Sequence, residues 1–443
     1  MSLSRELGWK EATSLGIGAM VGAGIFVLSG VAAGKAGPAV IVSFVLAATL
    51  TVLLGLCYAE LASRYPRAGG SYEYVREMMG PFVGTLIGWS YWGAWLAASS
   101  FVSQGFGNYL HSLTGAPPLY SAILLLLLLG VLNVLGIRFS GKVQLGIVSV
   151  VILVLVGFLV LGFSHVNTSL YSPFSPNGWS GILAAALVGF LSLVGWDAIV
   201  DSGEEIKNPK KTIPLSIFLS IGIVLLLYLG LLFISTGVVH WKELGSSEVP
   251  VALASEQFLG SFGPTFISIV IVIALPATAN AFIVSISRTA FAMGRNGLLP
   301  RKISYIHPRL QTPIWAIVLG VGIQVSFTLF SSINIAVNAT GFLYLLTFIF
   351  TMISFFLSRR RIKGKDQKEQ FLVPFYPVVP LLALLISVGL LIPVGSTGFL
   401  TGMLWILIGG ILYAIRSKTI HAVDQNRLHR ERRTIHREES LQR

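Results

Sequence analysis

The sequence predicts an all-α polytopic membrane protein with twelve transmembrane helices. Of its 443 residues, 54% are hydrophobic and only 11% are charged, which lies far outside the composition of soluble globular domains. The mean hydropathy is +0.80. Windows of about 20 residues, the length that crosses a bilayer as a helix, separate the chain into twelve apolar runs.

The twelve apolar runs are the expected transmembrane helices, and their even number places both ends of the chain on one side of the membrane. In chain order they cover residues 12–34, 39–60, 82–110, 118–136, 143–163, 180–202, 213–238, 262–293, 313–330, 333–357, 375–394 and 396–415. The first run lacks the small-residue cleavage site of a signal peptide, so we expect it to be retained as a helix.

Positive charge is divided unequally between the two sides of this arrangement. The net charge is +13. Every Lys and Arg except Lys35 and Lys242 lies in the termini, in the loops that follow even-numbered runs, or at the helix ends next to those loops. This asymmetry follows the positive-inside rule and predicts cytoplasmic termini, in what we expect to be a bacterial cell membrane. The basic loops are therefore expected to face membrane lipids, and no nucleic-acid partner is predicted. No sequence signal indicates an oligomeric state.

The first run contains residues that a helix tolerates poorly at its centre. Gly22, Ala23 and Gly24 lie in its middle. A helix break at membrane depth leaves N–H and C=O groups unpaired, which lipid does not tolerate but a protein cavity does. We therefore expect helix 1 to unwind around Gly22 to Gly24 and to expose backbone groups that hold a ligand.

The sixth run has an interruption of its own, between Gly189 and Trp196. We expect helix 6 to unwind around Phe190 to Val194 and to face the same cavity. When runs 1 to 5 are compared with runs 6 to 10, the two breaks correspond, and because five is odd the halves have opposite topology. Such a 5+5 inverted repeat with broken helices 1 and 6 indicates a secondary transporter with its binding site near the bilayer midplane.

This repeat defines the expected domain organisation. The first repeat covers residues 1–170 and the second 171–370. Two uniformly apolar, peripheral helices follow in 371–415, and a basic cytoplasmic tail forms 416–443.

Four motifs resemble those of the amino acid, polyamine and organocation (APC) superfamily, and in particular bacterial amino acid permeases. They have the order and spacing found there: GIGAMVGAGIF at 16–26, YAELASRYPRAGGSYEYVREMMG at 58–80, VGWDAIVDSGEEIKNPKKTIP at 194–214 and SRTAFAMGRNGLLP at 287–300. The resemblance covers roughly residues 5 to 415. It implies transport of a small molecule, with amino acids as the substrate class.

The two breaks suit the charges of a zwitterionic amino acid. The second half of helix 1 begins with free N–H groups at the positive end of a helix dipole, which favours an α-carboxylate. The first half of helix 6 ends in carbonyls, which favour an α-ammonium. Alternatively, these glycines serve only the close packing of helices. We expect that a large residue in place of Gly24 blocks binding and leaves the fold intact.

The resemblance assigns these roles to particular residues. It implies that Ala23 and Gly24 hold the carboxylate, that the carbonyls of Met20, Leu191 and Val194 hold the amine, and that the side chain of Ser192 contacts the substrate. The candidate substrate-binding residues are therefore Met20, Gly22, Ala23, Gly24, Phe190, Leu191, Ser192 and Val194.

Substrate selectivity is expected from helices 3, 6, 8 and 10. Trp89, Trp92 and Trp95 share one face of helix 3, and each either contacts substrate or packs against neighbouring helices. Many superfamily members have an aromatic gate where this chain has Leu191, so the gate is Leu191, Phe190 or Trp196. No Asp or Glu lies at the expected pocket positions of helices 1, 3, 8 or 10, which favours a neutral substrate.

Coupling is the least defined property. Asp197 is the acidic residue deepest in any run, and it is either a proton carrier or a partner for the freed backbone of helix 6. Residues 143–160 lack the lysine that some proton-coupled relatives carry there, and Thr278 supplies the only hydroxyl between Ala277 and Phe282 for a sodium site. Exchange or proton coupling is therefore expected, with Asp197 and Trp196 as the coupling or gating candidates.

Other charged residues are expected near the cytoplasmic ends of the helices. Asp201, Glu204 and Glu205 can pair there with Lys207, Lys210 and Lys211. Glu60 with Arg64 and Arg67, and Arg295 after helix 8, are either cytoplasmic gate or loop-anchoring charges or the charges of a solvated loop.

An enzyme is not predicted, and neither is a cofactor or a metal. The chain has one cysteine, Cys57, and shows no Ser-His-Asp set, P-loop or dinucleotide fingerprint. The leading prediction is a secondary active transporter of neutral amino acids that works by alternating access. A channel or membrane receptor with structural helix breaks is the alternative, although no repeated polar rings of a pore are evident.

Overall fold

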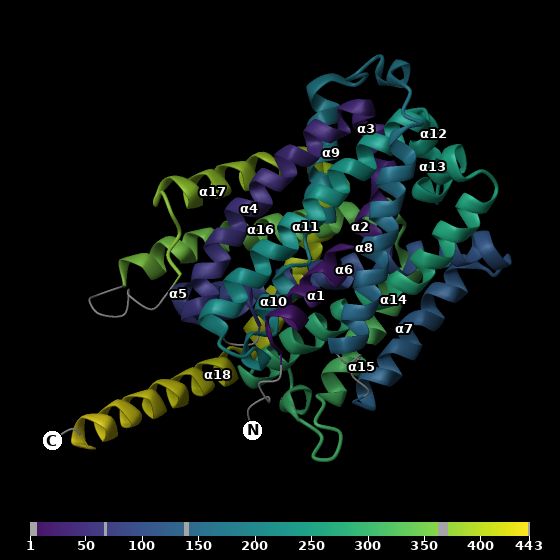
Figure 1. The fold of residues 1–443 in the computed structure, drawn as a ribbon. Coiled ribbons are helices and arrows are strands. Elements are labelled where there is room, and N and C mark those ends of the chain that lie inside the picture. Colours follow the sequence, from purple (N-terminus) through teal and green to yellow (C-terminus); the bar gives the residue numbers. More distant parts are fainter. Residues whose placement is uncertain (1–6, 66–68, 137–140, 362–370, 442–443) are drawn as a thin grey trace.

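The computed structural model shows long helices packed side by side (Figure 1). It describes residues 7–65, 69–136, 141–361 and 371–441. In these ranges the one pairing of extended backbone is a parallel bridge between Leu7 and Ile206, so the expected all-α class is confirmed. Seven helical stretches in the described part are long and apolar enough to cross a membrane.

Helices coincide with all of the predicted apolar runs in the first half of the chain. They are α1 (Trp9–Met20), α2 (Ala23–Phe26) and α3 (Leu28–Ala36) for the first run, η1 (Gly37–Ala39) and α4 (Val40–Arg64) for the second, α6 (Pro81–Thr114), α7 (Pro118–Val134) and α8 (Gly141–Phe163). The short helix α5 (Ser71–Met79) lies between the second and third runs.

The second half shows the same correspondence. Its helices are η2 (Thr168–Tyr171), α9 (Gly178–Leu193), α10 (Asp197–Asp201), η3 (Gly203–Glu205), α11 (Pro209–Val238), α12 (Trp241–Ser246), α13 (Pro250–Leu259), α14 (Phe262–Arg295), η4 (Arg301–Ser304), α15 (Ile314–Phe330), α16 (Ile333–Arg360), α17 (Val378–Gly389), η6 (Ile392–Val394) and α18 (Gly395–Leu441).

Local sequence signals set several of these boundaries. Pro81 occupies the first turn of α6, where its missing N–H costs nothing, and Gly115 ends that helix with φ +72°. Ser332 caps α16 by accepting the N–H of Ile335 at 3.4 Å.

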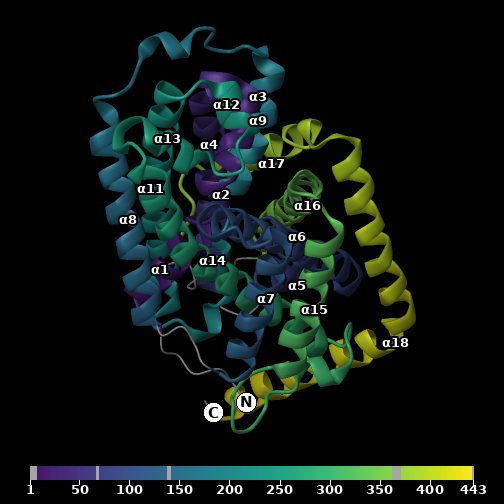
Figure 2. The same ribbon diagram turned by 90° about the vertical axis from the view of Figure 1, so that its right-hand side faces the viewer.

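The long helices pack in two groups (Figure 2). Helices α1 to α4 and α9 to α11 contact one another, and so do α6, α7, α14 and α15. Helix α8 contacts α1, α11 and α14, whereas α16 contacts α9, α4 and α6. Under a repeat that relates the first five runs to the next five, these two sets of contacts are equivalent.

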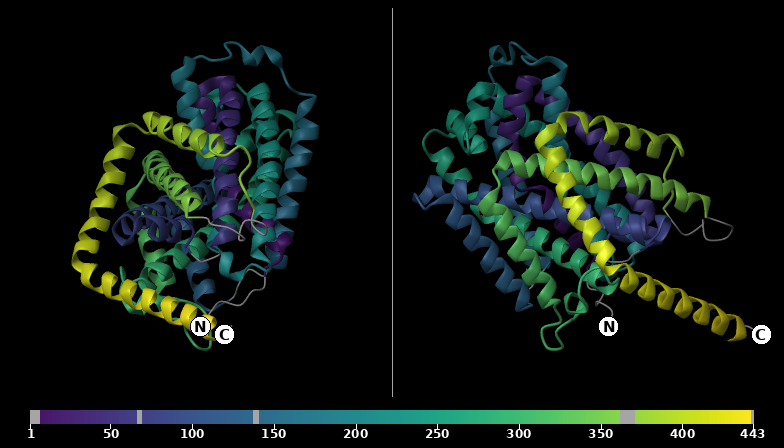
Figure 3. Two further views of the ribbon diagram at one scale, coloured as in Figure 1. Left: turned by 90° about the vertical axis from the view of Figure 1, so that its left-hand side faces the viewer. Right: turned by 180° about the vertical axis from the view of Figure 1, so that it is seen from behind.

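Helices α17 and α18 lie at the periphery (Figure 3). The start of α1 and the last part of α18 lie at one end of the molecule, and α3 and α12 lie at the other. Helix α18 continues without a break from the last apolar run into the expected tail, and its C-terminal part extends away from the other helices.

The break in helix 1 lies slightly earlier than expected. Helix α1 ends at Met20, Val21 and Gly22 form a bend, and α2 begins at Ala23. Ala23 and Gly24 are therefore the first residues of the second half and not part of the unwound segment. A side chain at Gly22 would overlap Thr278 of α14, so the bend lies where α14 approaches the backbone most closely.

The break in helix 6 lies later than expected. Helix α9 continues through Leu193, and the non-helical residues are Val194, Gly195 and Trp196. The expected unwinding of Phe190 to Val194 is therefore wrong except at Val194. Gly195 has φ +133°, a conformation that glycine adopts easily and other residues rarely do, so the chain leaves the helix there.

We expect Gly195→Ala to lower the thermal stability of the protein. An added Cβ would lie 2.8 Å from the carbonyl carbon of Ala19, and the positive φ adds strain, typically about 1–2 kcal/mol for a residue with a Cβ. The control is Gly222→Ala in α11, where the space is open and the substitution favours the helix by up to about 1 kcal/mol. Thermal unfolding in detergent compares the two, and equal transition temperatures would contradict this geometry.

Candidate functional site

The break in helix 1 leaves backbone donors at the start of α2. The N–H of Val21 bonds to the carbonyl of Ile17 at 2.6 Å, and the N–H of Gly22 bonds to that of Met20 at 2.9 Å. Among the hydrogen bonds of the described residues, none is donated by the N–H of Gly24. This free group lies at the positive end of the second half of helix 1, where an anion is stabilised.

The break in helix 6 leaves backbone acceptors at the end of α9. In the described stretch that follows, the N–H of Gly195 bonds to Oδ1 of Asp197 at 3.1 Å and not to a carbonyl of α9. The N–H groups of Ala198 and Ile199 bond to Gly195 and Trp196. The carbonyls from Phe190 to Leu193 therefore remain as the negative end of α9, which suits a cation.

The two breaks are in direct contact. Oγ of Ser192 donates to the carbonyl of Gly24 at 2.6 Å. A Cβ on Gly24 would lie 2.8 Å from both Cα and the carbonyl oxygen of Ser192, and one on Gly195 would lie 2.8 Å from the backbone of Ala19. These glycines thus serve close packing as well, and a large residue at Gly24 would meet the backbone of Ser192.

Three further hydroxyl groups, which belong to other helices, also fix the broken helix 1. Oη of Tyr228 donates to the carbonyl of Met20 at 2.6 Å, and Oη of Tyr109 donates to that of Phe26 at 2.7 Å. Oγ1 of Thr278 donates to the carbonyl of Gly18 at 2.7 Å. Sequence reasoning missed the two tyrosines, whose only signal is an isolated hydroxyl in an apolar run.

The three tryptophans of α6 have different surroundings. Trp89 stacks on Trp405 of α18 with ring centroids 5.0 Å apart, and each indole N–H bonds to the other's carbonyl. Trp92 donates to the carbonyl of Ile286 in α14. Trp95 contacts Phe282 at 4.8 Å, one turn beyond Thr278 on α14, so it is the tryptophan of this face that lies toward the break in helix 1.

Two of the three gate candidates, Phe190 and Trp196, form an aromatic cluster with α16. Phe190 and Trp196 both contact Phe348, with ring centroids 5.7 Å and 6.3 Å away. Trp196 also contacts Tyr58 of α4 at 5.0 Å. Trp196 therefore links the break in helix 6 to two neighbouring helices.

Asp197 and Asp201 lie together in the core, both fully buried. Oη of Tyr91 lies 3.1 Å from Oδ2 of Asp197 and 3.0 Å from Oδ2 of Asp201. Asp197 thus satisfies the freed N–H of Gly195, as one of the two sequence interpretations proposed. The expected pairing of Asp201 with cytoplasmic lysines is wrong. Asp201 lies one helical turn after Asp197, so both side chains are on the same face of α10 and contact Tyr91.

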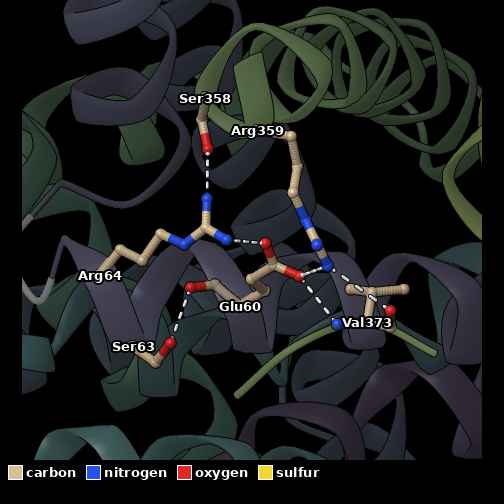
Figure 4. Close-up of polar contacts among 6 residues, drawn as sticks. All are labelled: Glu60, Ser63, Arg64, Ser358, Arg359 and Val373. Carbon is tan, nitrogen blue, oxygen red and sulfur yellow. Dashed lines mark hydrogen bonds and ion pairs between the residues drawn. The ribbon is translucent and has the colours of Figure 1, made fainter. Parts of the chain in front are cut away.

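An ionic cluster joins α4, α16 and the chain that enters α17 (Figure 4). Glu60, fully buried, pairs with Arg64 and, at 2.5 Å, with Arg359 of α16. Its Oε2 also accepts the N–H of Val373 at 2.7 Å. Glu60 and Arg64 are therefore buried and paired and are not charges of a solvated loop, and Arg67 lies outside the described residues.

A second set of ion pairs links the segment after α10 to the end of α14. Glu205 pairs with Arg288, and Glu204 lies 3.4 Å from Arg295. Arg295 also lies 3.5 Å from Glu73 of α5. These arginine partners come from a distant part of the chain.

Comparison with known proteins explains this architecture. A family model described as "Amino acid permease" matches residues 7–415, nearly the whole chain. The chain belongs to the amino acid permease family. The resemblance to the APC superfamily is thereby confirmed, and the permease is an integral membrane transporter and not an enzyme.

Several curated relatives are similar over most of their length. The methylthioribose transporter of Bacillus subtilis is 31% identical over 94% of each chain. The branched-chain amino acid permease BcaP of the same organism is 31% identical over 96% of this chain and 95% of its own. Cationic amino acid transporter 9, chloroplastic, of Arabidopsis thaliana is 34% identical over 69% of this chain and 58% of its own.

Glu60→Gln is expected to destabilise the permease strongly. It leaves Arg64 and Arg359, which are mostly buried, without their carboxylate, and loss of one partner from a buried pair costs on the order of 3 kcal/mol. Glu204→Gln is the control, because Glu204 and Arg295 are 22% and 38% exposed and such a pair contributes about 1 kcal/mol or less. Similar thermal shifts for the two variants would refute a structural role for the Glu60 cluster.

Proposed function

We propose that the permease is a secondary active transporter of neutral amino acids that works by alternating access. The observation that carries this proposal is the contact between the start of α2 and the end of α9. The first of these helix ends has a free N–H and the second has free carbonyls. An amino acid presents an α-carboxylate and an α-ammonium, so the two helix ends match both charges without an ionised side chain.

The roles of individual residues follow from their remaining hydrogen-bonding capacity. Ala23 and Gly24 hold the carboxylate beside the bend at Gly22, and the carbonyls of Leu191 and Val194 hold the ammonium. Met20 is less suited to that role, because its carbonyl already accepts the N–H of Gly22 and the hydroxyl of Tyr228.

The walls around the breaks favour a neutral side chain. Trp95, Phe282 and Tyr344 are buried aromatic residues in mutual contact through Trp95. The buried carboxylates of Asp197 and Asp201 already share Tyr91. A lysine or arginine head group in such a pocket would lose its hydration without gaining a dedicated partner. Several relatives are named for cationic amino acids, so the class of side chain requires a direct test.

The proposed architecture has twelve membrane spans in a 5+5 inverted repeat, with both termini in the cytoplasm. The equivalent contacts of α8 and α16 support the repeat, and the distribution of Lys and Arg supports the orientation. In this orientation the clusters around Glu60 and Arg295 lie at the cytoplasmic side and open during each transport cycle. Trp196 is the proposed gating residue, with Leu191 covering the substrate.

For coupling we propose exchange or proton coupling without sodium. Thr278 is the hydroxyl between helix 1 and α14, and it already donates to the carbonyl of Gly18. Any proton dependence is routed through Asp197. A driving ion does work only to the extent that it binds one conformation better than the other.

Neutral amino acids should compete for binding better than basic ones. With purified permease and radiolabelled leucine, unlabelled leucine, alanine or methionine is expected to displace the label, and arginine at the same concentration is not. The measurement is a scintillation proximity competition assay. Stronger displacement by arginine than by every neutral amino acid would reverse the assigned substrate class.

Amino acid inside liposomes should accelerate uptake of labelled substrate, and sodium outside should not be needed. Liposomes preloaded with unlabelled substrate are expected to take up label faster than empty ones, because exchange returns a loaded carrier. A channel with structural helix breaks would show no such acceleration. Stimulation by an inward sodium gradient, relative to choline, would contradict sodium independence.

A further inference from the structure

The most unusual polar feature of the core is a pair of carboxylates that share one hydroxyl. Asp197, Asp201 and Tyr91 have no exposed surface. Oη of Tyr91 lies 3.1 Å from Oδ2 of Asp197, and 3.1 Å and 3.0 Å from the two carboxylate oxygens of Asp201. The two acids lie one helical turn apart, in α10.

The hydrogen bonds of Tyr91 disfavour joint ionisation of the two acids in this arrangement. A tyrosine hydroxyl has one hydrogen and donates it to one carboxylate. The second carboxylate would then face the lone pairs of the same oxygen, and two like charges this close disfavour joint ionisation. A proton on the second acid removes the conflict, because that acid then donates to the oxygen of Tyr91.

The remaining hydrogen bonds indicate which acid carries the proton. Asp197 already accepts the N–H of Gly195 through Oδ1, which stabilises its ionised form. Among the donors described for Asp201, Tyr91 alone makes a hydrogen bond within 3.5 Å. The consistent chain runs from the protonated carboxyl of Asp201 to the hydroxyl of Tyr91 and from that hydroxyl to Oδ2 of Asp197.

Groups on every neighbouring element bear on this site. Two buried hydroxyls, Oη of Tyr344 and Oγ of Ser285, lie beside Asp197 and Asp201 and make no hydrogen bond of their own among the described residues. Arg288 of α14 acts on Asp201 from a distance but forms its ion pair with Glu205. The other titratable groups that face the pair are Tyr58 of α4 and Tyr74 of α5.

We infer that Asp197 and Asp201 form a single proton-binding site, with the proton held on Asp201 and relayed through Tyr91. The proton comes from water, and no bond other than the O–H bond forms or breaks. The site communicates with the break in helix 6, because Asp197 holds the N–H of Gly195 in that break. Its use in coupling rests on the proposed transport function, whereas the existence of the proton does not.

Infrared spectroscopy of the purified permease tests the proton without a substrate. The parent protein at neutral pH should show the C=O stretching band of a buried protonated carboxyl. Asp201→Asn and Asp197→Asn should each remove this band, because the single remaining carboxylate then accepts the hydrogen of Tyr91. Glu204→Gln, which removes a partly exposed carboxylate nearby, should retain it.

The infrared result has two outcomes that overturn the inference. A parent spectrum without the band, or a band that survives in both Asp variants, means that the pair holds no shared proton. Loss of the band on addition of sodium chloride, with potassium chloride as the control, means that the site binds a metal cation instead. Thermal unfolding of each variant confirms that it is folded before its spectrum is interpreted.

A second measurement tests coupling to the substrate. The dissociation constant of leucine for the parent should change with pH by up to about tenfold per unit, the limit for one linked proton. In Asp201→Asn this dependence should disappear while binding persists, because the substrate charges are held by backbone. An unchanged pH dependence in that variant overturns the coupling. If leucine does not bind the parent, the proposed function fails, and the infrared result still decides the proton site.

Discussion

The central constraint on this structure is that backbone N–H and C=O groups cannot remain unpaired in lipid, where each costs several kcal/mol. Both broken helices meet it with side chains from other parts of the chain. Tyr228, Thr278 and Tyr109 bond to carbonyls of helix 1, and Asp197 accepts a freed N–H of helix 6. The backbone groups that stay free belong to two helix ends in direct contact, which is why the proposed substrate site lies there.

Glycine has two functions in this centre, and they are not alternatives. At Gly195 the positive φ ends the helix, and at Gly24 the missing side chain lets helix 1 approach the backbone of Ser192. Close packing brings the ends of the two half-helices together, so it creates the arrangement of opposite dipoles that suits a zwitterion. Packing and binding therefore impose the same requirement on the same residues.

The acidic residues that pair with arginine are separated from this centre by depth. Glu60, Glu73, Glu204 and Glu205 all have arginine partners near one end of the helices. The pairs of Glu204 and Glu205 join the two packing groups, since both residues follow α10 and their arginine partners lie on α14. Any movement of one group against the other must therefore exchange these contacts, and the buried acids of α10 lie between them and the helix breaks.

The sequence by itself determined the membrane class, the position of the long apolar helices and which two runs are interrupted, because apolar run length and glycine placement are local properties that the bilayer constrains directly. It also indicated the family, since the motifs around Gly24 and Asp197 are continuous in the chain. Only the tertiary structure decided which partner each polar group has: Tyr228 for Met20, Arg288 for Glu205 and Tyr91 for both aspartates. Such pairs join residues far apart in sequence, and their register depends on how helices pack, which local periodicity does not encode.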